Sequence, residues 1–142
     1  NSDQFTDLNL SDNTIKQEGA QSIATAIAQM PQLRHLNLGD CLLGTEGAIL
    51  VANALREGHE MLETVDLVFN EMGDDAAMAL IEALEGKKQL KRVELNGNEF
   101  SASVLKALEE SSFGHLLGTM SDNEGDDEDD DEDDEENEDD DE

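Results

Sequence analysis

The chain has 142 residues, with 8 Lys and Arg against 37 Asp and Glu, and a formal net charge of −29 at pH 7. This balance disfavours a nucleic-acid-binding protein and attachment to an anionic membrane surface, because both depend on Lys and Arg near phosphates. No apolar run approaches the roughly 18 residues that a membrane-spanning helix needs. The single cysteine excludes an internal disulfide.

Four segments share one apolar pattern, in which an apolar residue, a spacer, a leucine and two further residues precede Asn or Cys. The last position of the pattern is Asn13, Cys41, Asn70 and Asn98 in turn, at spacings of 28, 29 and 28 residues. A recurring unit of this length and composition is typical of leucine-rich repeats, near the long end of their range.

Within each repeat the apolar spacing changes. The first half alternates apolar and polar residues, which predicts a short strand, and the second half has helical spacing, which predicts a helix of about three turns. The apolar helix positions are Ala20, Ile23, Ala24 and Ile27, then Ala48, Val51, Ala52 and Leu55, then Ala77, Leu80, Ile81 and Leu84. We therefore predict an α/β solenoid with parallel strands on a concave face and helices on a convex face.

The Asn that ends each motif is expected to be buried. Its amide can donate to and accept from backbone groups in the turn after the strand, so that stacked copies form a ladder. Cys41 takes this place in the second repeat. We interpret it as a structural rung, because a thiol tolerates burial.

Strand alternation indicates which side chains face a partner. Positions between core residues are expected on the concave face, and these are Asn9, Asn37, Asp66 and Glu94. A parallel row holds Asp7, His35, Thr64 and Arg92. At the rim, where the strand turns toward the helix, lie Asp12 and Asp40. We predict that a basic protein partner binds Asn37, Asp40, Asp66, Glu94 and Asp12; the alternative is an ordinary solvated strand face.

Phe69 occupies the rim position that holds Asp12 and Asp40 in the earlier repeats. An aromatic residue there is either an exposed anchor or a local core filler, and we favour the filler.

The sequence carries no motif for catalysis, for phosphate binding or for a metal site. His35 and His59 have no second His, Cys or carboxylate at metal-ligand spacing, and we interpret them as surface residues. We therefore expect no catalytic residue, no metal and no cofactor, and a protein that acts by binding another protein.

The two ends of the repeat region differ. Phe113, Leu116, Leu117 and Met120 recur at helical spacing, which predicts a helical cap over the last repeat. At the other end the pattern begins midway, at Phe5 and Leu8, so we expect a fragment of a longer solenoid. We assign residues 1–120 to four repeats with this cap.

Residues 121–142 contain 18 acidic side chains and no Lys or Arg. Like charges at this density repel one another and leave too little apolar surface for a core. We predict a disordered polyacidic tail over residues 121–142, which would steer basic proteins toward the repeats.

Particular segments resemble the Ran GTPase-activating protein family. They are Leu36-Asn37-Leu38-Gly39-Asp40-Cys41-Leu42-Leu43, the following Glu46-Gly47-Ala48, Leu95-Asn96-Gly97-Asn98, and the acidic run after the last repeat. The repeat with a helical second half is similar to the ribonuclease-inhibitor type, and the resemblance covers the whole chain.

This resemblance implies a GTPase activator for the small GTPase Ran in its GTP form, and not an enzyme in its own right. It implies action in the cytoplasm, with association at the nuclear envelope, where such proteins give nucleocytoplasmic transport its direction. The family's Asn and Arg that are tied to hydrolysis belong to earlier repeats, and no position here matches them. The chain would supply the far end of the solenoid.

Two other classes of binding protein remain open. An acidic leucine-rich nuclear protein that binds histones or a phosphatase also joins repeats to an acidic tail, but its repeats are shorter. A ribonuclease-inhibitor-like scaffold is rich in cysteine and has no polyacidic tail, whereas this chain has one cysteine.

Overall fold

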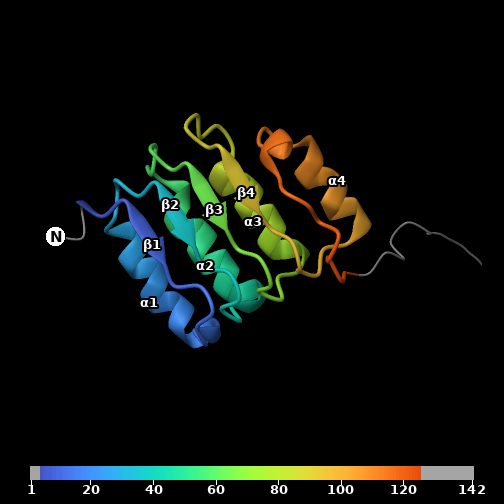
Figure 1. Ribbon diagram of the computed structural model, residues 1–142, viewed down its shortest axis with the longest axis horizontal. Helices are drawn as coiled ribbons and strands as arrows, with labels where there is room; N and C mark the ends of the chain where they lie inside the picture. Colours follow the sequence, from blue (N-terminus) through green and yellow to red (C-terminus); the bar gives the residue numbers. More distant parts are fainter. Residues whose placement is uncertain (1–3, 126–142) are drawn as a thin grey trace, which may run out of the picture.

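The computed structural model describes residues 4–125. One parallel sheet contains, in spatial order, β1 (Asp7–Asn9), β2 (His35–Asn37), β3 (Thr64–Asp66) and β4 (Arg92–Glu94). Each strand is followed by a helix: α1 (Lys16–Ala28), α2 (Gly44–Arg56), α3 (Asp74–Leu84) and α4 (Ala102–Glu110). Figure 1 shows the strands side by side on one face and the helices behind them. The predicted α/β solenoid is confirmed.

Each three-residue strand turns one apolar side chain inward. Leu36, Val65 and Val93 are at most 1% exposed, whereas Leu8 of the edge strand β1 is only partly buried. The helices contribute the opposite wall of the core through the small and branched residues predicted from their spacing, among them Ala48, which is fully buried. The core therefore runs as a continuous layer between sheet and helices.

The predicted ladder is present, and Asn70 shows its chemistry. Its Oδ1 accepts hydrogen bonds from the backbone N–H groups of Cys41 and Leu43, both at 3.1 Å. Its Nδ2 donates to the carbonyl oxygens of Leu38 at 2.8 Å and Leu67 at 3.1 Å. One buried side chain thus joins the second repeat to the third.

The neighbouring ladder residues, Asn98 and Cys41, differ in the hydrogen bonds that their side chains can form. Asn98 repeats the pattern, with Oδ1 accepting from the N–H groups of Asn70 at 2.9 Å and Met72 at 3.1 Å. Cys41 is fully buried, as predicted, with Sγ 3.1 Å from the carbonyl oxygen of Leu10. Burial raises the pKa of its thiol.

The predicted helical cap is wrong in its conformation. Only η2 (Gly114–Leu116) is helical, as a single 3₁₀ turn, and Leu117 then pairs in parallel with Val93 of β4. The N–H of Gly118 donates to the carbonyl oxygen of Val93 at 3.1 Å. Two glycines interrupt the apolar spacing, so the segment turns once and then extends alongside the sheet, as the last part of the ribbon in Figure 1 shows.

The described part of the chain continues into the segment that the sequence assigns to the tail. Asn123 accepts from the N–H of Phe100 and donates to its carbonyl oxygen, both at 2.8 Å, and so adds a further rung to the ladder. The N–H of Asp122 donates to Oδ1 of Asn96 at 2.9 Å. Residues 121–125 therefore pack on the fourth repeat, and the remainder of the predicted tail lies outside the described residues.

The surface assignment of His59 is wrong, because this residue is 5% exposed. It lies in the loop after α2, where its Nε2 is 2.9 Å from the carbonyl oxygen of Ile27 in α1. The ring therefore bridges the ends of two successive helices. Within the described part of the chain, no helix is long and apolar enough to cross a membrane.

Candidate protein-binding site

The strand register aligns the polar side chains of the concave face into the two predicted rows. One row contains Asn9, Asn37, Asp66 and Glu94, and the other contains Asp7, His35, Thr64 and Arg92. Side chains of both rows, with the exception of Glu94, line a shallow depression of about 200 Å³. Asn37 and Asp66 lie next to each other in this depression.

Asn37 and Asp66 also have a structural task. Oδ1 of Asn37 accepts a hydrogen bond from the N–H of Gly39 at 2.9 Å, and Oδ1 of Asp66 accepts one from the N–H of Val68 at 3.2 Å. Each side chain thus closes the turn that follows its own strand. The second polar atom of each has no hydrogen-bond partner among residues 4–125, and it is this atom that a partner could bind.

Glu94 takes a different position from its neighbours in the row. Its carboxylate lies so close over Gly118 that a side chain at residue 118 would collide with it. Its Oε2 is 3.6 Å from Nε of Arg92, in an ion pair. Glu94 therefore belongs to the contact between the sheet and the segment after η2, outside the concave depression.

The rim residues share one backbone conformation. Asp12, Asp40 and Phe69 have left-handed φ values of 63°, 54° and 54°, at the position just before each ladder residue. Both aspartates are exposed. The five predicted partner-binding residues consequently form no single cluster: two lie in the depression, two on the rim and one against the segment after η2.

The interpretation of Phe69 as a core filler is wrong, because it is 49% exposed. The residue at the same position of the next repeat is Gly97, and a Cβ there would collide with the Phe69 ring. The ring therefore rests on the backbone of Gly97 instead of entering the core. Asp40 and Phe69 together line a second depression, of about 250 Å³, on the rim.

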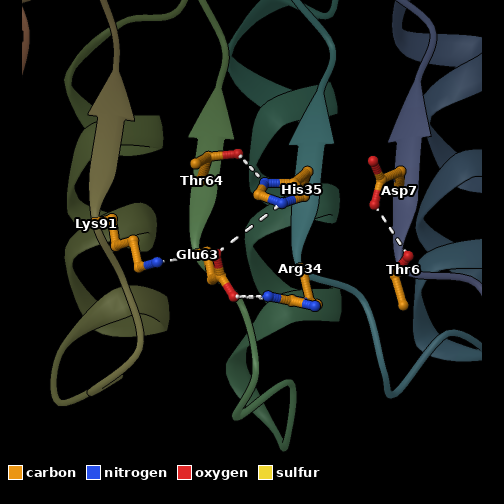
Figure 2. A network of polar contacts seen from close by, with 7 residues as sticks. All are labelled: Thr6, Asp7, Arg34, His35, Glu63, Thr64 and Lys91. Carbon is orange, nitrogen blue, oxygen red and sulfur yellow. Dashed lines mark hydrogen bonds and ion pairs between the residues drawn. The ribbon is translucent and has the colours of Figure 1, made fainter.

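A charged network, absent from the residues predicted above, lies where the strands begin, on the side of the sheet away from the rim. Glu63 is 8% exposed, and its Oε2 lies 2.6 Å from a guanidinium nitrogen of Arg34, while its Oε1 lies 3.4 Å from Nζ of Lys91. Figure 2 shows Glu63 between these two cations, which come from the repeats on either side. The hydrogen bond from Arg34 lowers the pKa of the Glu63 carboxyl below its usual value.

The signal for this network is present in the sequence. Arg34, Glu63 and Lys91 occupy the same position of successive repeats, each directly before a strand, and their charges alternate in sign. Equivalent positions of stacked repeats lie side by side, so the alternation predicts attraction across the strands. The network joins the second, third and fourth repeats on the side of the depression where the strands begin.

Comparison with known proteins shows which proteins this chain resembles. The family model described as leucine rich repeat matches residues 5–24, 29–52 and 58–80. The chain is 33% identical to RAN GTPase-activating protein 2 of Arabidopsis thaliana over 121 residues, which are 84% of this chain and 22% of that protein. Over 72 residues it is 38% identical to Ran GTPase-activating protein 1 of Xenopus laevis, covering 48% of this chain and 12% of that protein.

A third relative is the ribonuclease inhibitor of Mus musculus, which is 32% identical over 109 residues, or 73% of this chain and 24% of that protein. The chain spans less than a quarter of the length of each of these three proteins. The matches agree with the observed solenoid of parallel strands and outer helices. The chain has a leucine-rich repeat fold of the ribonuclease-inhibitor type and resembles the Ran GTPase-activating proteins.

Proposed function

We propose that the chain is part of a GTPase activator that stimulates GTP hydrolysis by the small GTPase Ran. The observation that carries the proposal is its 33% identity to a RAN GTPase-activating protein across 84% of the chain. The ribonuclease inhibitor is matched at nearly the same identity, so the repeat alone does not select a function. The second Ran GTPase-activating relative adds support.

In this proposal the chain binds the GTP form of Ran, and the hydrolytic chemistry belongs to Ran. Asn37 and Asp66 would contact the partner through the polar atoms left over from their turns, and Asp12 and Asp40 would contact it at the rim. Glu94 would contribute charge from the edge of the site. Acidic and amide groups of this kind complement a basic surface and accelerate its approach.

The proposal also includes a place of action and a role for the tail. The activator would work in the cytoplasm and at the nuclear envelope, and would give nucleocytoplasmic transport its direction by keeping Ran in its GDP form there. The acidic residues after 125 would raise the local concentration of basic proteins near the repeats.

The test is a binding titration of the full chain with Ran loaded with a non-hydrolysable GTP analogue or with GDP. We expect tighter binding of the GTP-analogue form. Replacing both rim aspartates, Asp12→Lys with Asp40→Lys, should weaken binding by about tenfold or more, because reversed charges repel a basic surface. Glu109→Lys with Glu110→Lys on the exposed end of α4 makes the same change of charge, so it is the matched control and should have little effect.

A single-turnover hydrolysis assay with the same proteins separates binding from activation. We expect binding without acceleration, because no position of this chain matches the family residues tied to hydrolysis. The proposal fails if neither nucleotide form of Ran binds, or if the control variant weakens binding as much as the rim variant. Binding of histones in place of Ran would favour an acidic leucine-rich nuclear protein.

A further inference from the structure

The rim carries an exposed apolar patch that the proposed function does not use. In the first three turns, the side chains directly before and directly after the ladder residue are exposed. In the middle repeats these positions place Phe69 and Leu42 beside a depression of about 250 Å³, whose other side chains are Asp40, Glu71, Glu99 and Glu124. We call these six residues the rim patch.

The apolar part of the rim patch consists of two exposed side chains that lie beside one depression. Phe69 is 49% exposed and Leu42 is 39% exposed, although the corresponding rim positions of the first repeat hold the polar residues Asp12 and Thr14. The backbone of Gly97 supports the Phe69 ring from below, which leaves its other face open. Contiguous exposed apolar side chains on a small protein commonly mark a surface that binds another molecule.

The polar part of the rim patch has a single sign of charge. None of its four carboxylates takes part in the ion pairs found among residues 4–125, and no Lys or Arg lines the depression. The described residues contain no group of three His, Cys, Asp or Glu placed to hold a metal ion. A second copy of the chain is a poor occupant, because each copy carries a net charge of −29.

We infer that the rim patch docks a cationic protein segment in which an apolar side chain stands between Lys or Arg residues. The apolar side chain would enter the depression against Phe69 and Leu42. The flanking cations would lie among Glu71, Glu99 and Glu124, which come from successive repeats and from the segment that follows them. The inference rests on the proposed function only for the identity of the partner, since the chemistry follows from the patch itself.

Two peptides test this chemistry on the full chain. One has a leucine flanked on each side by two arginines, and the other has serine in place of leucine at the same charge. We expect the leucine peptide to bind about tenfold more tightly, as burial of one aliphatic side chain predicts. Nuclear magnetic resonance titration should shift the amide signals of Leu42 and Phe69 with the leucine peptide.

The decisive variant is Phe69→Asp. Asp12 and Asp40 occupy the same position with the same left-handed backbone, so the substitution suits the local conformation. It adds a negative charge that should favour any cationic peptide, yet we expect the preference for leucine over serine to disappear. Met78→Glu makes the same change of charge at a residue of α3 that is 47% exposed, and should leave the preference intact.

The charges are tested separately. Glu71→Lys should weaken both peptides severalfold, and more than Glu110→Lys on α4 does. Equal binding of the two peptides, or an unchanged leucine preference in Phe69→Asp, overturns the inference. A chain that binds Ran without any leucine preference keeps the proposed function and rejects the rim patch. A chain with the Phe69-dependent preference but no affinity for Ran supports the rim patch alone.

Discussion

The first and fourth repeats carry the same motif but differ in what lies against them. Asn13 of the first repeat is exposed, and its Oδ1 accepts no backbone hydrogen bond from the described residues. Asn98 of the fourth repeat is fully buried, and its Oδ1 accepts two. The comparison teaches that a ladder residue joins two repeats only where a neighbouring repeat supplies the donors, so we expect much of the stability to lie between repeats.

The largest expected effect is at the centre of the ladder. Asn70→Ala removes the acceptor for the buried N–H groups of Cys41 and Leu43, and each buried donor left without a partner is costly. We expect a loss of about 3 kcal/mol in the free energy of unfolding, measured by urea denaturation. Asn13→Ala removes a solvent-exposed copy of the same side chain and should cost well under 1 kcal/mol.

The informative quantity is the difference between the two variants in their loss of unfolding free energy. A similar loss for Asn13→Ala and Asn70→Ala would mean that the ladder acts within each turn and not between repeats. Double substitution at both positions should give the sum of the single effects, because the two rungs share no hydrogen-bond partner.

A smaller effect is expected where residues 121–125 pack on the fourth repeat. Asn123→Ala removes the two hydrogen bonds to the backbone of Phe100 and should destabilise the protein by about 1–2 kcal/mol. The change should be local, so that exchange of the Phe100 amide hydrogen accelerates while that of Leu67, which donates to the carbonyl of Glu94, changes much less. Uniform acceleration at both amides would contradict the local account.

The smallest effect concerns the Glu63 network and depends on pH. The pKa of Glu63 is lowered in the folded state, so its contribution is present above the unfolded pKa and is lost as pH falls through the folded one. Glu63→Gln should therefore be less stable than the parent at pH 7, and the difference should shrink below about pH 4.5, the ordinary value for this group.

Thermal unfolding of both proteins across this pH range measures that difference. Glu82→Gln is the control, because Glu82 forms an exposed ion pair with Arg56 at 3.4 Å, and exposed pairs contribute little. If the Glu63 difference is independent of pH, the network acts through shape and hydrogen bonding instead of charge.

The sequence predicts the structural features that recur in every repeat. Strand alternation places Asn37 and Asp66 on the concave face, and the motif places Asn70 and Asn98 inside, because stacking in register carries a local pattern along the whole solenoid. These predictions need only the spacing, and they are confirmed.

Other features depend on a neighbour that the spacing does not name. Phe69 is exposed because the next repeat has Gly97 beneath its ring, and His59 is buried because the end of α1 lies above it. The apolar residues of the cap fit helical spacing and so predict a helix, although Gly114 and Gly118 allow a turn and an extended segment. Each error comes from a contact between elements, which periodicity within one element cannot show.

Because all four strands run in the same direction, their starting ends lie along one side of the sheet and the rim lies along the other. The side before the strands holds Arg34, Glu63 and Lys91, whose charges alternate in sign, and the rim after the strands holds Asp40, Glu71 and Glu99, which are all acidic. Among the described residues, unbalanced negative charge is therefore concentrated along the rim, whereas the charges before the strands are largely paired. A cationic partner would experience a torque before it makes any contact, and would arrive with its positive side already turned toward the rim.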